Sequence, residues 1–135
     1  MNTDRLKFRV WDNELKEYVE YSAHDSVRMC LHPDGDLGYL YHDEEIRKAF
    51  NDGSLVVEQC TGLKDADGKL IYEGDILQTP SNTYFVRHDE KTCGFVCEYH
   101  IDDRMGLLLH SDLAFKKYRI VGNIHENPEL LEAGK

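Results

Sequence analysis

The stretch DADGKLIYEGDIL, from Asp65 to Leu77, decides how the second half of the chain is interpreted. It contains two turn signals separated by a short apolar segment. Asp67-Gly68 and Gly74-Asp75 are typical of tight turns, because Asp and Gly tolerate the positive φ angles that such turns require. Turns this closely spaced leave room only for short strands. The stretch therefore predicts β structure, with Ile71 and Ile76 available to fill its interior.

Further short strands are expected on both sides of this stretch. Apolar or aromatic residues alternate with polar ones, or form short β-branched runs, in residues 55–60, 83–88, 93–101 and 117–124. Several short strands at this spacing predict a small barrel or roll. Asn127-Pro128 then favours a short terminal helix, because Asn is a good cap and Pro suits the first turn. Leu130 and Leu131 are expected to dock this helix.

The first residues predict a hairpin. Leu6, Phe8 and Val10 alternate with two basic residues, which is the period of a half-buried strand. A turn is expected at residues 12–14, where Asx side chains can hydrogen-bond their own backbone, and a second strand at 18–21. Residues 22–42 are rich in loop signals.

A helix is expected over residues 42–50. Asp43 can cap it, acidic residues suit its positive N-terminal end, and Ile46, Ala49 and Phe50 would share one face. Asn51-Asp52-Gly53 would end it. The predicted fold class is therefore mainly β (α+β), with an N-terminal α+β portion over residues 1–58 and a C-terminal β portion over 59–135.

The cysteines suggest a metal site, but their spacing argues against one. Cys93 and Cys97 would lie on the apolar face of one strand, about 13 Å apart at the usual rise per residue. Two thiolates on one zinc ion must lie within roughly 4 Å of each other. We therefore predict buried core cysteines, no metal and no cofactor. The Asp65–Gly68 segment also lacks the glycine and glutamate positions of a calcium loop.

Charge argues against nucleic-acid binding, the commonest guess for a small β protein. The 135 residues carry 26 acids against 16 Lys and Arg, a net charge of -10, and both halves are acidic, at -6 for 1–58 and -4 for 59–135. Neither half offers the basic footprint that phosphate contacts need, so direct nucleic-acid binding is disfavoured. Hydrophobic residues at 41% indicate a globular protein.

No apolar run approaches the roughly 18 residues of a membrane span, and the N-terminus lacks the apolar stretch of a signal peptide. We expect a cytoplasmic protein with free thiols. The serines lack a nucleophile-elbow context, and no glycine-rich loop has a P-loop ending. No catalytic residues are assigned, and the chain is predicted not to be an enzyme.

Aromatic residues point instead to protein contact. Eight Tyr, five Phe and one Trp are many for so small a core. Trp11 ends the first strand out of phase with its apolar residues, and Tyr72 adjoins the Glu73-Gly74-Asp75 turn. Because aromatic side chains with a polar tip are enriched at protein interfaces, Trp11, Tyr72, Glu73 and Asp75 are the predicted contact surface.

Three motifs together resemble one family. They are KFRVWD at residues 7–12, TGLKD-x-x-GK-x-IYEGDI at 61–76, and VGNI-x-ENPELL at 121–131. In this order they are similar to the YopX family, small proteins encoded by bacteriophages and by prophages. His125 departs from the pattern, because an aromatic residue, usually Tyr, is expected there. The resemblance spans nearly the whole chain.

The resemblance implies an N-terminal α+β portion followed by a C-terminal SH3-like β-barrel, in a protein of the bacterial host cytoplasm. It implies no catalytic or ligand residues. The leading hypothesis is a non-enzymatic interaction module, acting as a homo-oligomer or on a host or phage protein. The alternatives are an acidic decoy, in which a carboxylate array mimics nucleic acid, and a nucleic-acid-binding SH3-like barrel.

Overall fold

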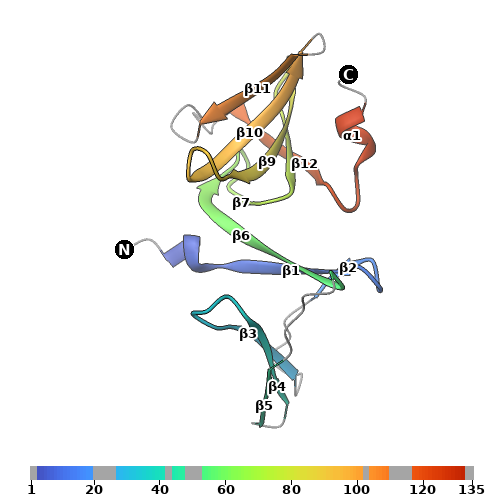
Figure 1. Ribbon diagram of the computed structural model, residues 1–135. Helices are drawn as coiled ribbons and strands as arrows, with labels where there is room; N and C mark the ends of the chain where they lie inside the picture. The colour runs from blue at the N-terminus through green and yellow to red at the C-terminus, as the bar shows by residue number, and fades with distance from the viewer. Residues whose placement is uncertain are drawn as a thin grey trace. The chain divides into compact units, whose positions relative to one another are not determined.

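The computed structural model describes residues 3–19, 27–41, 44–47, 53–101, 104–109 and 117–132. The chain divides into two compact units, one of Met1–Arg9 with Val57–Lys135 and one of Val10–Val56. Strands β1 (Phe8–Asp12) and β6 (Leu55–Lys64) each run from one unit into the other. The described residues are mainly β, in antiparallel sheets, as the sequence predicts (Figure 1).

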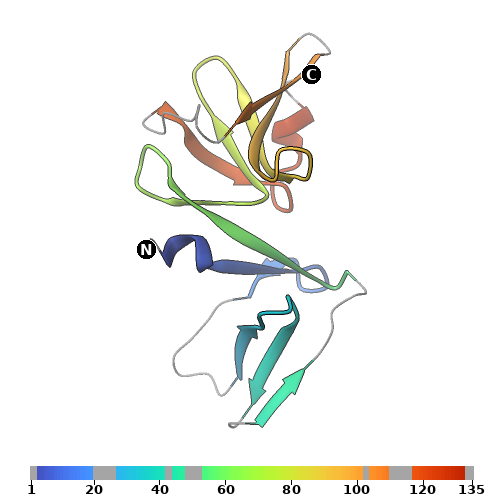
Figure 2. The same cartoon turned by 60° about the vertical axis from the view of Figure 1, so that its left-hand side comes forward.

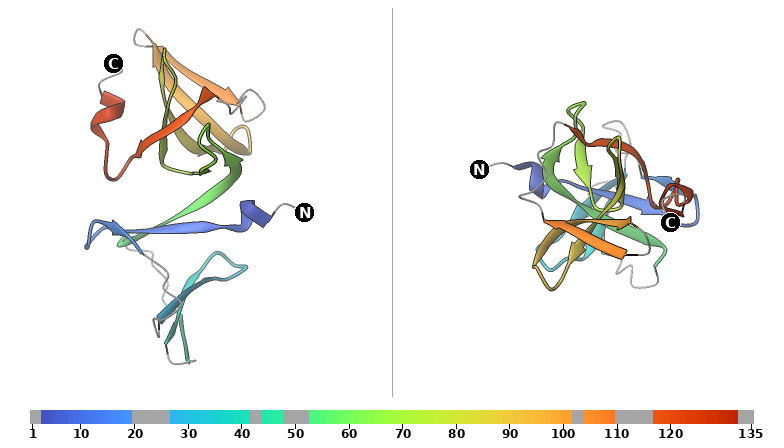
Figure 3. Two further views of the ribbon diagram at one scale, coloured as in Figure 1. Left: turned by 180° about the vertical axis from the view of Figure 1, so that it is seen from behind. Right: turned by 90° about the horizontal axis from the view of Figure 1, so that it is seen from above.

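The larger unit is built on a five-stranded antiparallel sheet with the order β11-β10-β9-β8-β12. Its strands curl around a common interior, as two views show (Figures 2 and 3). The unit also holds the 3-10 helix η1 (Thr3–Leu6), β7 (Leu70–Tyr72) and the helix α1 (Glu129–Glu132). The strands of the sheet are β8 (Asp75–Gln78), β9 (Thr83–Asp89), β10 (Gly94–Ile101), β11 (Arg104–Leu109) and β12 (Arg119–Asn123).

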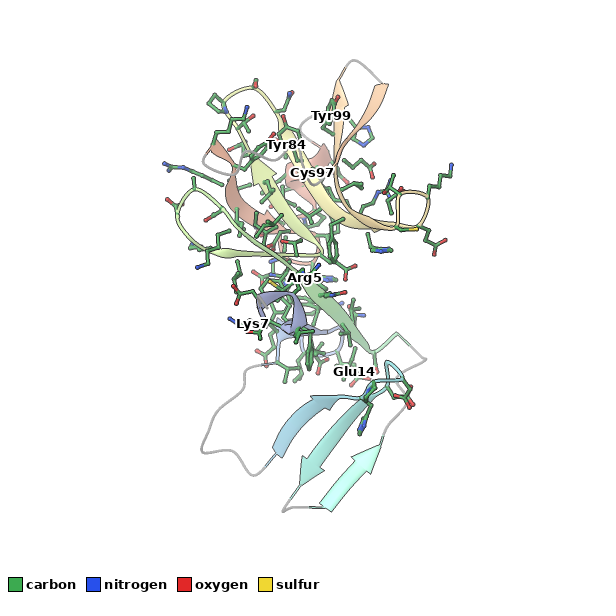
Figure 4. The ribbon with its side chains drawn as sticks, turned by 90° about the vertical axis from the view of Figure 1, so that its left-hand side faces the viewer. Arg5, Lys7, Glu14, Tyr84, Cys97 and Tyr99 are labelled. Carbon is green, nitrogen blue, oxygen red and sulfur yellow. The ribbon has the colours of Figure 1, made fainter. Side chains whose placement is uncertain are left out.

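Alternation along the strands builds the core of this unit. In β9, Tyr84 and Val86 are buried while the residues between and beside them are half-buried. The Tyr84 ring meets Tyr99 and Tyr118 edge-to-face, with centroids 5.6 and 5.2 Å apart. Figure 4 shows Tyr84, Cys97 and Tyr99 on neighbouring strands. The buried cluster comprises Ile71, Leu77, Tyr84, Val86, Cys97 and Tyr118.

The terminal helix is confirmed, as α1 packs beside β9. Its predicted cap makes a different contact, however. Asn127 Oδ1 accepts a hydrogen bond from the Asn123 N–H at 3.3 Å, while the Asn127 carbonyl accepts from Leu130. A Cβ at Gly122 would lie 2.4 Å from that amide oxygen, so the glycine permits this close approach.

The smaller unit corrects the prediction for residues 42–50. Residues Glu44–Arg47 form a strand, β5, paired with β4 (Leu37–Tyr41), and Ile46 stands opposite Tyr39. Residues 42–43 and 48–50 lie outside the described residues. The helix prediction for 44–47 is wrong because so short a segment gains little from helix formation, whereas β4 offers a ladder of backbone hydrogen bonds. Strand β3 (Val27–Leu31) completes a sheet with the order β3-β4-β5, within a region that the sequence marks as loops.

The predicted N-terminal hairpin is present but shorter. Asp12 Oδ1 accepts hydrogen bonds from the Glu14 and Leu15 N–H groups, as the Asx turn requires. The second strand, β2, is only Glu17–Tyr18. Leu6 lies in η1 and is exposed, so it does not belong to the strand face on which the alternation placed it.

The burial of Cys97 is confirmed, but that of Cys93 is wrong. Cys93 is exposed in the turn before β10, with a φ of 54°, because the strand begins only at Gly94. Its thiol donates to the Glu90 carbonyl at 3.6 Å. The predicted strand therefore begins one residue before the observed strand does. Cys60 is fully buried in β6.

Candidate functional site

A buried polar cluster centred on Arg9 lies in the larger unit. Arg9 comes from the end of β1 that belongs to this unit, and its side chain contacts two buried carboxylates. Its Nε lies 2.6 Å from Glu58 Oε2 and its Nη2 lies 2.8 Å from Asp75 Oδ1. The same Nη2 donates to the Glu73 carbonyl at 3.0 Å. The planar guanidinium thus joins β1 to β6 and to the turn before β8, a geometry that Lys cannot reproduce.

Tyr72 covers the guanidinium of Arg9. The Arg9 Cζ lies 4.9 Å from the centre of the Tyr72 ring, within the range of a cation–π contact. The Tyr72 N–H donates to Asp75 Oδ2 at 2.8 Å. Burial raises the pKa of the Tyr72 hydroxyl. The ring therefore shields the arginine while the backbone of the same residue orients its carboxylate partner.

His125 completes the cluster from the turn after β12. Its Nε2 lies 2.5 Å from Glu58 Oε1, and both side chains are largely buried. Because a carboxylate only accepts, Nε2 carries the hydrogen. Gly74, with a φ of 85°, faces the same carboxylate, and a Cβ there would lie 2.9 Å from Glu58 Oε1. A side chain at position 74 would therefore be strained and would crowd Glu58.

The turn that carries His125 is organised by one amide. Asn123 Oδ1 accepts hydrogen bonds from the N–H groups of His125 and Glu126, at 3.0 and 2.9 Å. The Ile124 N–H donates to the Gly74 carbonyl at 2.8 Å. These bonds tie the third motif to the second and hold the backbone that carries the imidazole.

All four carboxylate oxygens of the cluster have a partner: Arg9 and His125 for Glu58, Arg9 and the Tyr72 N–H for Asp75. Burial raises the pKa of the Asp75 carboxyl above its ordinary value, and Arg9 opposes that rise. A carboxylate engaged on both oxygens is poorly suited to act as a general base or metal ligand. Such a closed network is chemically a brace between distant segments. Within the described ranges, no group of three or more His, Cys, Asp or Glu is placed to hold a metal ion.

The structure brings three of the four predicted contact residues together. Tyr72, Glu73 and Asp75 surround Arg9, and Glu73 Oε1 accepts from the Gln59 N–H at 2.9 Å. Asp75 is only 2% exposed, while Tyr72 and Glu73 are half-buried. Trp11 belongs to the smaller unit, where it is 3% exposed and meets the Tyr18 ring at 5.0 Å. Its Nε1 donates to Asn13 Oδ1 at 3.0 Å.

Sequence reasoning missed Arg9, Glu58 and His125 as members of a site. One signal was present: Glu58 interrupts the apolar run Leu55–Cys60, and Arg9 stands between Phe8 and Val10. A charge inside a strand pattern is more often a solvated side chain, and nothing in the local sequence shows that these two charges meet.

Asp65 makes a second polar junction at the edge of the five-stranded sheet. Its carboxylate accepts from the N–H groups of Asp67 and Lys69, each at 2.9 Å, and of Ile120 in β12 at 3.1 Å. Burial alone would raise the pKa of this carboxyl, but the three backbone donors outweigh it and lower the pKa. Asp65 therefore holds the turn after β6 against β12.

The two edges of this sheet differ. On β12, the outward N–H groups of Ile120 and Asn123 are bonded by the side chains of Asp65 and Asn127, and the Ala66 N–H donates to the Tyr118 carbonyl at 2.8 Å. On the other side, β11 is the outermost strand and pairs with β10 over its whole length. No second strand pairs with β11 among the residues that the structure describes.

Comparison with known proteins identifies relatives. A family model described as YopX protein matches residues 7–132. The crystal structure of protein yopX from Bacillus subtilis superimposes with a TM-score of 0.57 at 21% identity, covering 95% of this chain and 97% of that one, which shows a shared fold. Protein EF1440 from Enterococcus faecalis matches with 28% identity, a TM-score of 0.47 and coverage of 93% and 96%.

No curated protein sequence matches the chain. The helices of the described residues include none that is long and apolar enough to cross a membrane.

Proposed function

The chain belongs to the YopX family, and on this premise we propose that it is a non-enzymatic interaction module that pairs with a second copy of itself. The proposal rests on the contrast between the two edges of the five-stranded sheet. At the β12 edge, the side chains of Asp65 and Asn127 accept hydrogen bonds from backbone N–H groups. At the other edge, β11 is the outermost strand.

The composition of β11 suits edge pairing. Its sequence is RMGLLL, with one charge at its start, no proline and three consecutive leucines. Native proteins blunt exposed edges with charges, prolines or bulges, and a long apolar edge without them is a site of strand addition. Two antiparallel copies of β11 around a two-fold axis would satisfy each other's outward backbone groups.

We also propose that the curled sheet is an SH3-like barrel of phage or prophage origin, acting in the cytoplasm of the bacterial host. Support for the barrel comes from the hydrogen bonds between the turn after β6 and the strand β12. Asp65 and Ala66 of that turn are hydrogen-bonded to Ile120 and to the Tyr118 carbonyl, which is the contact expected where a barrel closes.

Light scattering coupled to size-exclusion chromatography tests the pairing. The wild-type chain is expected to elute as a dimer at tens of micromolar. Position 107 of β11 stands opposite Glu98 in β10. Leu107→Lys is expected to shift the protein to monomer, since a lysine on an outer strand opposes edge-to-edge pairing. Val121→Lys, on the capped strand β12, is the matched control and is expected to remain dimeric.

Circular dichroism of each variant would show that the fold is retained. A strictly monomeric wild-type protein would overturn the proposal. So would a folded Leu107→Lys variant that dimerises as well as the wild type does.

A further inference from the structure

A cavity of about 330 Å³, lined by both polar and apolar residues, opens on the larger unit away from the Arg9 cluster. One wall is the loop between β8 and β9, and another is Leu131 of α1. Its floor includes Phe85, which alternates in β9 with the core residues Tyr84 and Val86 and so faces the opposite side of the sheet. The volume lies within the range of about 300–1,000 Å³ that is typical of small-molecule sites.

The loop wall is organised by its own hydrogen bonds. The Thr79 N–H donates to the Asn82 carbonyl at 2.9 Å, and the Asn82 N–H donates to Thr79 Oγ1 at 3.2 Å. Asn82 Nδ2 also lies 3.4 Å from the Tyr84 hydroxyl. These bonds hold the loop in one conformation, so its polar groups need little ordering when a ligand arrives.

The charges around the cavity favour an uncharged ligand. Glu98 and His100 line it, and Glu98 is bonded on both oxygens, to Arg87 Nε at 2.7 Å and to His100 Nε2 at 3.1 Å. A carboxylate so engaged has little left to attract a cation. Among the described residues that line this cavity there is no Lys or Arg, so a phosphate or carboxylate ligand would find no fixed positive charge on them.

The uncharged polar groups that line the cavity are suited to bind the hydroxyl groups of a sugar. Amides and hydroxyls both donate and accept hydrogen bonds, as does each hydroxyl of a sugar. Gln78, Asn82 and Thr83 offer such groups along one side. Phe85 and Leu131 offer apolar surface for the C–H face of a sugar ring. We propose that this cavity is a carbohydrate-binding site for a neutral sugar.

Two-dimensional amide NMR of the full chain tests the site. The probes are glucose, N-acetylglucosamine and maltose at millimolar concentration, with uracil as a neutral ligand that contains no sugar. At least one sugar is expected to shift the signals of residues 78–85 and the Gln78 and Asn82 side-chain amides in a saturable way. Signals of Gln59, an exposed glutamine outside the cavity, should not move.

Two substitutions distinguish sugar binding in the cavity from a non-specific effect of sugar on the whole protein. Gln78→Ala changes an exposed side chain and is expected to weaken sugar binding roughly two- to tenfold, as the loss of one neutral hydrogen bond does. Phe85→Leu keeps an apolar side chain but removes the ring, and we expect a loss of roughly tenfold. Gln59→Ala is the matched control and should bind as the wild type does.

The proposal fails if no sugar shifts these signals at millimolar concentration, or if uracil alone does so. It also fails if both cavity variants, shown by their NMR spectra to be folded, bind sugar unchanged.

Discussion

His125 Nε2 lies 2.5 Å from Oε1 of Glu58, a residue that precedes it by 67 positions in the chain. The contact links the turn after β12 to β6, and through Arg9 to β1. The three family motifs therefore converge, since the first supplies Arg9, the second supplies Asp75, and the third supplies the turn that carries His125.

Replacing His125 with Phe should destabilise the fold. Phe cannot donate, so Glu58 Oε1 would remain buried without that partner, at a cost of about 1–3 kcal/mol. His125→Gln, which keeps a side-chain N–H, is expected to retain part of the lost stability. Urea denaturation at neutral pH measures both variants, and equal stability of the Phe variant and the wild type would contradict this role.

Removing Arg9 should be more costly. Arg9→Met leaves two buried carboxylates next to each other without their shared cation, and we expect a loss of about 3–5 kcal/mol in the free energy of unfolding. The control is Lys7→Met, which removes the exposed pair between Lys7 and Asp4 and should change the free energy of unfolding far less than Arg9→Met does, because solvent screens exposed pairs. If both variants unfold at the same urea concentration, the cluster is not a structural brace.

Asp65 should contribute to acid stability. Its folded-state pKa lies below the ordinary value of 3.8, because three backbone N–H groups favour the carboxylate. The stabilisation is therefore complete above pH 3.8 and is lost as the pH falls through the folded-state value. Asp65→Asn should lose about 2 kcal/mol at neutral pH and show a shallower loss of stability in acid.

Thermal melts of the two proteins between neutral pH and about pH 2 would compare these slopes. Asp67→Asn, an exposed neighbour in the same turn, is the control. Parallel curves for wild type and Asp65→Asn would exclude the predicted linkage.

The thiols should differ sharply in reactivity. Burial raises the pKa of the Cys97 thiol to about 12, so almost no thiolate forms at neutral or mildly basic pH. Cys93 is exposed and accessible. Iodoacetamide at about pH 8 should alkylate Cys93 in the folded protein and leave Cys97 unmodified until denaturant is added. Peptide mass spectrometry locates the label, and early labelling of Cys97 would show that its strand opens readily.

Local pattern predicted the strands well where one face is buried and the turns are tight. The alternation around Tyr84 and Val86 and the Asx turn at Asp12 are both confirmed. The pattern failed where pairing with a distant strand outweighs local preference, as in Glu44–Arg47. It also failed at Cys93, because the exact start of a strand depends on the turn that precedes it.

The polar cluster could not be predicted for a different reason. Arg9, Glu58 and His125 each have unremarkable neighbours in the sequence, and their contacts exist only after β1, β6 and the turn after β12 have come together. Periodicity reports which face of a strand a residue occupies. It does not report which charged residue from another strand it will meet.

The hydrogen bonds that Asp65 and Asn127 accept from β12 also limit how many strands from other copies can be added to the sheet. A sheet whose outer backbone groups are already occupied on one side can be extended only from the other. Edge-to-edge pairing of copies through this sheet would therefore end at two chains. Although the chain has an apolar outer strand, open-ended fibres could not form through that strand.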